Sequence, residues 1–219
     1  MHLTWQPPAF VADVRRCADI DQEHRLWRLF MNNYGLQALL AYRLGRWLLH
    51  TRRRCLLWPL LPVGWAIYYL LSRAAWMAYD IRLELSADIG PGLYIGHFGA
   101  IRLRQCRVGA NCSIGHLTRI SAAADGTGPV IGERVWIGAH ARIVGPYRIG
   151  SDATVSAGTS IHRDIPPGVL CIGNPARLVR RNYNNRLILG LTEEAVHGRP
   201  RSAALAVSAG RPAQLRGGA

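Results

Sequence analysis

The hydrophobic positions of the chain follow three different patterns in turn. Between residues 24 and 50, leucines and aromatic residues recur at spacings of three and four, which is the period of an amphipathic helix. Asn32, Asn33 and Gly35 interrupt this pattern with residue types that favour turns. We therefore expect two helices in this region, with a break near residues 32–35.

Residues 56–71 form the second pattern, an apolar stretch without a charged residue. It is shorter than the roughly 20 apolar residues that a membrane-spanning helix needs, and Pro59 and Pro62 disturb its first half. One interpretation is a buried helix that caps a larger assembly. The other is an interfacial segment, in which residues 50–71 contact a membrane surface through arginines at the headgroups and aromatic side chains in the boundary layer.

The third pattern begins near residue 81, where an aliphatic residue returns every six positions. Glycine often follows it directly. A hexapeptide repeat explains this spacing, whereas the periods of helices and strands do not. Three hexads close one triangular coil, so we expect about four coils of a parallel β-helix between residues 89 and 166, with the aliphatic side chains stacked inside. The predicted inner positions are Ile89, Ile95, Ile101, Val108, Ile114, Ile120, Ile131, Ile137, Ile143, Ile149, Val155 and Ile161.

Two irregularities interrupt the hexads: one extra residue before Val108 and a longer step from Ile120 to Ile131. The step contains SAAADGTGPV (121–130), which we expect to form a loop that projects from the prism, and such loops often carry function. The segment after Ile161 is expected to close the prism. The predicted organisation is a helical region over 1–80, a β-helix over 81–181 and a basic, largely disordered tail over 182–219.

The chain is strongly basic, with a net charge of +14, and all of its basic residues other than histidine are arginines. A basic surface favours anionic partners. No zinc-finger spacing, RNP motif or basic zipper is present, so we expect no nucleic-acid partner. Five cysteines without a CxxC pair argue against a disulfide framework, and the first residues lack the pattern of a signal peptide. We therefore expect a cytoplasmic protein, with any membrane contact at the inner face.

Three segments carry a resemblance to a known family. They are LYIGHFG (93–99), VWIGAHARIVG (135–145) and IHRDIPPGVLCIGNPARLV (161–179), set within the hexads. Together they resemble the hexapeptide acyltransferases, and most of all the serine O-acetyltransferase branch with its exopolysaccharide-acetylating relatives. The resemblance implies a left-handed parallel β-helix, a homotrimer with active sites in the grooves between adjacent β-helices, acetyl-CoA as co-substrate, and no metal.

The resemblance also implies roles for individual residues. His97 in LYIGHFG corresponds to the catalytic base. Gly138, Ala139, Ala157 and Gly158 correspond to turn residues that contact the coenzyme A arm, and Arg163 to a partner for one of its phosphates. Imidazole, with an ordinary pKa of about 6.5, is largely neutral near pH 7, so it can accept the proton of an acceptor hydroxyl and then protonate the departing thiolate.

The acceptor stays open between L-serine and a sugar or exopolysaccharide hydroxyl. The serine-specific enzymes carry aspartates where this chain has Gly96 and Arg82, and an Arg-His pair where it has residues 127–129, Thr-Gly-Pro. Two other classes of function also stay open. One is a non-catalytic hexapeptide scaffold. The other is a γ-type carbonic anhydrase that would bind a metal through His97, His116 and His140.

Overall fold

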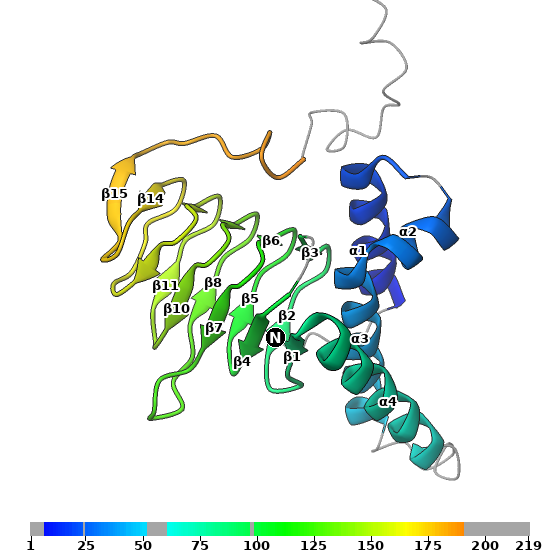
Figure 1. Cartoon of the computed structure of the whole chain (residues 1–219). Helices are drawn as coiled ribbons and strands as arrows, with labels where there is room; N and C mark the ends of the chain where they lie inside the picture. The colour runs from blue at the N-terminus through cyan, green and yellow to red at the C-terminus, as the bar shows by residue number, and fades with distance from the viewer. Residues whose placement is uncertain (1–6, 24, 52–60, 97–98, 191–219) are drawn as a thin grey trace, which may run out of the picture.

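The computed structural model describes residues 7–23, 25–51, 61–96 and 99–190, which form four helices followed by a solenoid of short strands (Figure 1). The helices are α1 (Pro7–Asp21), α2 (Leu26–Asn32), α3 (Tyr34–Thr51) and α4 (Leu61–Tyr79). The strands are β1 (Ile81–Leu83), β2 (Asp88–Ile89), β3 (Tyr94–Ile95), β4 (Ile101–Arg104), β5 (Arg107–Val108), β6 (Ser113–Ile114), β7 (Arg119–Ser121), β8 (Val130–Ile131), β9 (Trp136–Ile137), β10 (Arg142–Val144), β11 (Arg148–Ile149), β12 (Thr154–Val155), β13 (Ser160–Ile161), β14 (Leu170–Ile172) and β15 (Arg177–Arg180).

The strands form three sheets that are the walls of a prism of about five coils. Sheet A has the order β1-β4-β7-β10-β13, sheet B the order β11-β8-β5-β2, and sheet C the order β15-β14-β12-β9-β6-β3. Every pairing in sheets A and B is parallel, and the terminal pair β14–β15 of sheet C is antiparallel. The predicted parallel β-helix with an N-terminal helical region is confirmed. Left-handed winding stays an implication of the resemblance.

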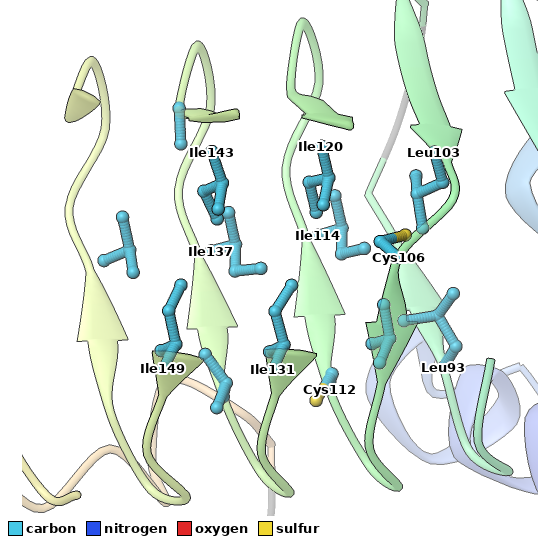
Figure 2. Close-up of a cluster of buried hydrophobic side chains, with 14 of the residues drawn as sticks. Leu93, Leu103, Cys106, Cys112, Ile114, Ile120, Ile131, Ile137, Ile143 and Ile149 are labelled. Carbon is cyan, nitrogen blue, oxygen red and sulfur yellow. The ribbon is translucent and has the colours of Figure 1, made fainter. Parts of the chain in front are cut away.

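The aliphatic hexad residues line the interior, as the sequence predicts. All twelve predicted positions are at most 3% exposed, and they stack from coil to coil (Figure 2). Ile137, for example, pairs in register with Ile114 on one side and Val155 on the other. Burying one such side chain contributes roughly 1.5–3 kcal/mol, so this column is the main source of solenoid stability.

The first coil departs from the hexad spacing in sheet A. Leu103, and not the predicted Ile101, pairs with Ile120, while Ile101 pairs with Ile81. The step from Ile95 of sheet C to Leu103 of sheet A is therefore two residues longer than the equivalent step from Ile114 to Ile120 in the next coil. These additional residues belong to the connection between β3 and β4, which includes the predicted base.

The long step of the repeat and the closing segment both have the predicted character. The loop between β7 and β8 projects from the prism, and its residues 124–127 are exposed (Figure 1). A backbone hydrogen bond from the Ala123 N–H to the Thr127 carbonyl, 2.9 Å long, closes it. After Ile161 the chain forms β14 and turns back as β15, which covers the end of sheet C.

The two helices predicted over residues 24–50 are confirmed as α2 and α3. Asn33 lies between them, and its Oδ1 accepts a hydrogen bond of 2.8 Å from the Leu36 N–H, which caps the first turn of α3. Helix α1 was not predicted. Its first residues are Pro7 and Pro8, which are tolerated in a first turn because the N–H groups there have no helical partner.

Helix α4 is largely exposed within the single chain. Of residues 61–71, none is buried, and Leu70 is 72% exposed, so its burial in a larger assembly and its contact with a membrane both stay predictions. The helix packs on α3 along one side and leaves Val63, Ile67 and Met77 exposed on the other. Residues 52–60 lie outside the described residues. Within the described ranges, no helix combines the length and apolar composition that crossing a membrane requires.

A buried ion pair joins the helices to the first coil. Arg43 of α3 donates to the Asp13 carboxylate of α1 at 2.9 Å and to the carbonyls of Ile89 and Gly90 at 2.7 and 2.6 Å. The same carboxylate accepts the Gly92 N–H at 2.7 Å. Burial raises the pKa of Asp13, and the Arg43 guanidinium opposes this rise. Because a buried charge is costly without its partner, this network fixes the helical region firmly to the solenoid.

The chain continues as an ordered segment beyond the predicted end of the β-helix. Residues 182–190, the strap, run back along the prism towards the helices (Figure 1). Asn185 is buried and donates hydrogen bonds to the carbonyls of Arg134 and Ala153, at 2.8 and 3.3 Å. Leu189 is fully buried, and its carbonyl accepts a hydrogen bond from Arg16 of α1. The folded part therefore extends beyond residue 181, and residues 191–219 lie outside the described residues.

Candidate active site

One edge of the prism collects most of the predicted site residues. This C–A edge, where the chain passes from sheet C to sheet A, consists in the described part of the chain of residues 96, 99–100, 115–118, 138–141 and 156–159 in successive coils. Its coils are joined by backbone hydrogen bonds, including those from the Leu117 N–H to the Gly99 carbonyl (3.0 Å) and from the His140 N–H to the His116 carbonyl (2.9 Å). Leu117 and His140 have left-handed φ values of 58° and 60°, so the edge turns sharply in every coil.

His97 lies outside the described residues, but its segment begins and ends on this edge. The Gly96 N–H donates to the Ile114 carbonyl at 2.9 Å, which sets the start of the connection. At its other end, the position that a Cβ of Gly99 would take lies 3.5 Å from the Tyr79 carbonyl at the end of α4. The ring of Tyr79 stacks on that of Tyr34 at 4.1 Å. The segment of the predicted base therefore adjoins the helical region, a neighbourhood that the sequence did not indicate.

The four residues predicted to contact coenzyme A lie on the same edge, in the third and fourth coils. A Cβ on Gly138 would lie 2.5 Å from the Ala157 backbone nitrogen, so coil stacking by itself requires glycine there. Gly158 differs, because it has a φ of 69° and no atom within 4 Å of its Cβ position. Ala157 and Gly158 are exposed and Ala139 is half-buried, so the edge offers accessible backbone that a long ligand could approach.

Arg163 lies on a different edge. It follows β13, where the chain leaves sheet A, whereas the other predicted residues come before sheet A. Its guanidinium donates a hydrogen bond of 3.3 Å to the Ala176 carbonyl near the closing end of the prism. The structure therefore separates Arg163 from the four other positions predicted for coenzyme A.

Two further histidines lie on the C–A edge. The rings of His116 and His140 are exposed and 5.8 Å apart in an edge-on arrangement. Among the described residues, no three or more His, Cys, Asp or Glu side chains are grouped so that they could hold a metal ion. The three-histidine set of a γ-type carbonic anhydrase includes His97, and the described part of the chain supplies two of its members.

The described cysteines are buried thiols within the fold. Burial raises the pKa of Cys106 to about 12 and that of Cys112 to about 11. The thiolate is the nucleophilic form, so these two residues stay protonated and unreactive near neutral pH. Acyl transfer through either of them is therefore disfavoured, which leaves histidines as the titratable groups suited to proton transfer on the C–A edge.

The fold and this edge define a hexapeptide-repeat β-solenoid with an N-terminal helical region. No protein-family model matches the chain. Comparison with known proteins supports the resemblance stated above. The chain is 30% identical over 156 residues to the serine acetyltransferase of Buchnera aphidicola subsp. Schizaphis graminum, a match of 69% of this chain and 56% of that protein. It is 28% identical over 160 residues to the serine acetyltransferase of Helicobacter pylori 26695, covering 71% and 87% respectively.

Solved structures give the same result. Soybean serine acetyltransferase complexed with serine has a TM-score of 0.64 and 28% identity, with 80% of this chain and 70% of that one covered. Serine acetyltransferase from Brucella abortus S19 in complex with coenzyme A has a TM-score of 0.66 and 23% identity, with 79% and 67% covered. The resemblance to the serine O-acetyltransferase branch is therefore confirmed, although the chain spans little more than half of the Buchnera relative.

Proposed function

We propose that this protein is an acetyl-CoA-dependent O-acetyltransferase with His97 as the general base. The observation that supports the proposal is the C–A edge, on which Gly96 and Gly99, the described residues that flank the segment of His97, lie in line with the exposed backbone of Ala157 and Gly158. The named relatives support it, since they are serine acetyltransferases and one of the similar structures holds coenzyme A. Because a fold does not determine a function, a non-catalytic scaffold is the alternative, and the assay below distinguishes the enzyme from the scaffold.

The chain's own groups have simple tasks in this reaction. The imidazole of His97 takes the proton of the acceptor hydroxyl as the oxygen attacks the thioester carbonyl, and it returns the proton to the leaving sulfur. General acid–base catalysis of this kind contributes about 10²–10⁴-fold to a rate. The accessible coil edges leave room for the pantetheine arm of acetyl-CoA beside the backbone. Arg163 fits a phosphate contact less well, because it lies on another edge and its guanidinium is turned to Ala176.

The acceptor is a hydroxyl compound, and one observation favours a sugar over L-serine. The serine enzymes carry an aspartate where this chain has Arg82, whose guanidinium lies 4.0 Å from the Trp76 ring centroid and 3.8 Å from Asp80. A cation at this place repels the ammonium group of serine. The relatives' names favour L-serine, so the two acceptors are compared directly in the assay.

The main test follows release of the coenzyme A thiol from acetyl-CoA with L-serine and with sugar acceptors. We expect His97→Ala to lower kcat by about 10²–10⁴-fold with the KM for acetyl-CoA little changed. His162→Ala is the matched control, since His162 is exposed and lies off the C–A edge, and it should keep wild-type activity. Full activity of His97→Ala would contradict the assignment, and no transfer by the wild type to any hydroxyl would favour the scaffold.

A second substitution tests the acceptor. Among the described residues, the atom nearest to the Cβ position of Gly96 is the Ile114 carbonyl oxygen, at 3.6 Å, so the neighbouring coil leaves room for a side chain there. We expect Gly96→Asp to raise kcat/KM for L-serine relative to a sugar, because the carboxylate restores an anion beside the base. Gly96→Asn is the uncharged control. Equal effects of the two substitutions on the serine-to-sugar ratio would contradict this interpretation.

The assembly and the membrane contact are further parts of the proposal. We propose a homotrimer in which each C–A edge faces a neighbouring prism, and light scattering on the full chain measures its mass.

We also propose that residues 50–71 contact a membrane surface. The exposed Val63, Ile67 and Leu70 of α4 support this contact, and residues 52–60 of the segment lie outside the described residues. Co-sedimentation with anionic vesicles should weaken in Ile67→Asp/Leu70→Asp.

A further inference from the structure

Four arginines stand in register on the outer face of sheet A. Arg82 pairs with Arg102, Arg102 with Arg119, and Arg119 with Arg142, one from each of β1, β4, β7 and β10. All four are exposed. Neighbouring strands of a sheet lie about 4.8 Å apart, so this arginine row places one guanidinium per coil along the axis of the prism. The four strands lie side by side in Figure 1.

The arginine row is poorly neutralised. Asp80 is shared between Arg82 and Arg102, at 3.8 and 3.7 Å. Among the described residues, Arg119 and Arg142 have no acidic side chain within ion-pair distance. Like charges directly opposite each other destabilise a sheet. Stability of the solenoid therefore does not account for the row, and an external anion would supply the missing charge.

The equivalent positions of sheet B show that the repeat does not require arginine. There the outward residues in register are Asp88, Arg107, Val130 and Arg148, so no two arginines are neighbours. Arg107 also has an acid at 3.7 Å, in Asp88. The concentration of unneutralised positive charge is thus a property of one face and not of basic composition in general.

The spacing and chemistry of the arginine row fit an extended acidic polysaccharide. Guanidinium groups bind carboxylates through paired hydrogen bonds. One strand spacing is close to the rise of one sugar unit in an extended chain, so uronate carboxylates could meet successive coils. Single-stranded nucleic acids need aromatic side chains on which bases stack. The ring of Trp76 at the first end of the row is already covered by the Arg82 guanidinium, at 4.0 Å. The outward positions of sheet A itself hold no aromatic residue: besides the row and its neighbour Arg104, they are Ser121, Val144 and Ser160.

The row also runs beside the C–A edge. Arg102 follows Ala100 by two residues, and Arg142 follows His140 by two, so the row and the edge are parallel lines on the same side of the prism. We propose that the arginine row binds an acidic polysaccharide and that this polymer is the acceptor, the second part resting on the proposed function. A polymer held on the row presents its sugar hydroxyls along the C–A edge, where Gly96 and Gly99 flank the segment of His97.

The binding test uses fluorescently labelled oligogalacturonate and the full chain, without acetyl-CoA. We expect Arg119→Gln/Arg142→Gln to weaken binding about tenfold or more at low salt. The matched variant Arg107→Gln/Arg148→Gln removes the same charge from sheet B and should change binding less than about twofold. Rising ionic strength should weaken wild-type binding, and a neutral dextran should not bind. Equal losses in the two variants, or no loss in either, would overturn the proposal.

Two further measurements distinguish a failure of the arginine-row proposal from a failure of the proposed function. A single-stranded DNA of equal charge that binds as tightly, with the same dependence on Arg119 and Arg142, would overturn the assignment to a polysaccharide. His97→Ala should bind oligogalacturonate normally yet transfer no acetyl group to it. If His97→Ala stays active while the sheet A variant loses binding, the proposed base fails and the row stands. If the sheet A variant instead raises only the KM for acetyl-CoA, the row serves the donor and the inference fails.

Discussion

Sheets A and C meet at the C–A edge and share one interior, yet their outer faces differ. Sheet A presents its arginine row, whereas the parallel strands of sheet C hold Tyr94, Ser113, Trp136, Thr154 and Leu170 in register, with Arg180 opposite Leu170 only on the terminal antiparallel strand. The inner residues of both sheets are the same aliphatic types and are almost completely buried. The hexad thus dictates what points inwards and leaves the outward positions free to specialise: sheet A exposes its arginines, whereas Ser113 and Thr154 of sheet C are buried.

The largest expected effect concerns the interior that the two sheets share. Ile137 of sheet C and Ile143 of sheet A are both 0% exposed. Replacing either by alanine should lower the free energy of unfolding by about 2–5 kcal/mol, because the cavity left in a stacked column cannot collapse fully. Urea denaturation of the two variants measures this. Arg148→Ala on sheet B is the surface control, and a loss below about 0.5 kcal/mol for one isoleucine would show that the two sheets do not share one core.

A smaller effect is expected at the glycines of the edge. Gly138→Ala should cost about 1–3 kcal/mol, because its Cβ would lie 2.5 Å from the Ala157 nitrogen of the next coil. Gly96→Ala should be close to neutral, since its nearest neighbour is at 3.6 Å. Thermal unfolding of both variants tests the difference. Equal losses would mean that glycine is needed at both positions for stacking, and would remove the space on which the Gly96→Asp test depends.

The smallest effect concerns the outer face of sheet A. Arg119→Thr should raise the free energy of unfolding by about 0.2–1 kcal/mol relative to the same substitution at Arg148, because it removes a cation between two others. The gain should shrink at high salt, where the repulsion is screened. Arg148→Thr in sheet B, whose in-register neighbour is Val130, should show no such gain. A destabilised Arg119→Thr protein would show that the row contributes to the fold.

The interior of the solenoid could be predicted from sequence because one residue type recurs at one spacing. The segment of His97 and the edge positions of Ala139 and Gly158 followed from the same spacing and the resemblance. The arginine row could not be predicted, since Arg82, Arg102, Arg119 and Arg142 are separated by unequal intervals along the chain. Loops and additional residues between the strands absorb these differences, and only the pairing of β4 with β1 and β7 reveals the alignment.

The helical region shows a different limit. Helix α1 contains few strongly apolar residues, and its position depends on Asp13 and Arg16, which bind backbone groups of the first coils. Polar side chains that are buried by distant partners leave no periodic signal. Helix α4 shows a second limit. Its apolar sequence favours burial, but within the single chain α3 covers one side only, so the structure of one chain does not decide between an assembly and a membrane as the partner of the other side.

The strap changes how the prism should respond to stress. In a simple stacked array each coil contacts only the coils above and below it, so the last coil can unfold locally while the first stays folded. Here residues 182–190 return from the far end and insert Leu189 beside α1, which links the two extremities directly. Detaching this segment should therefore loosen the helices and the terminal coils together. These nine residues couple the unfolding of the two ends of the prism.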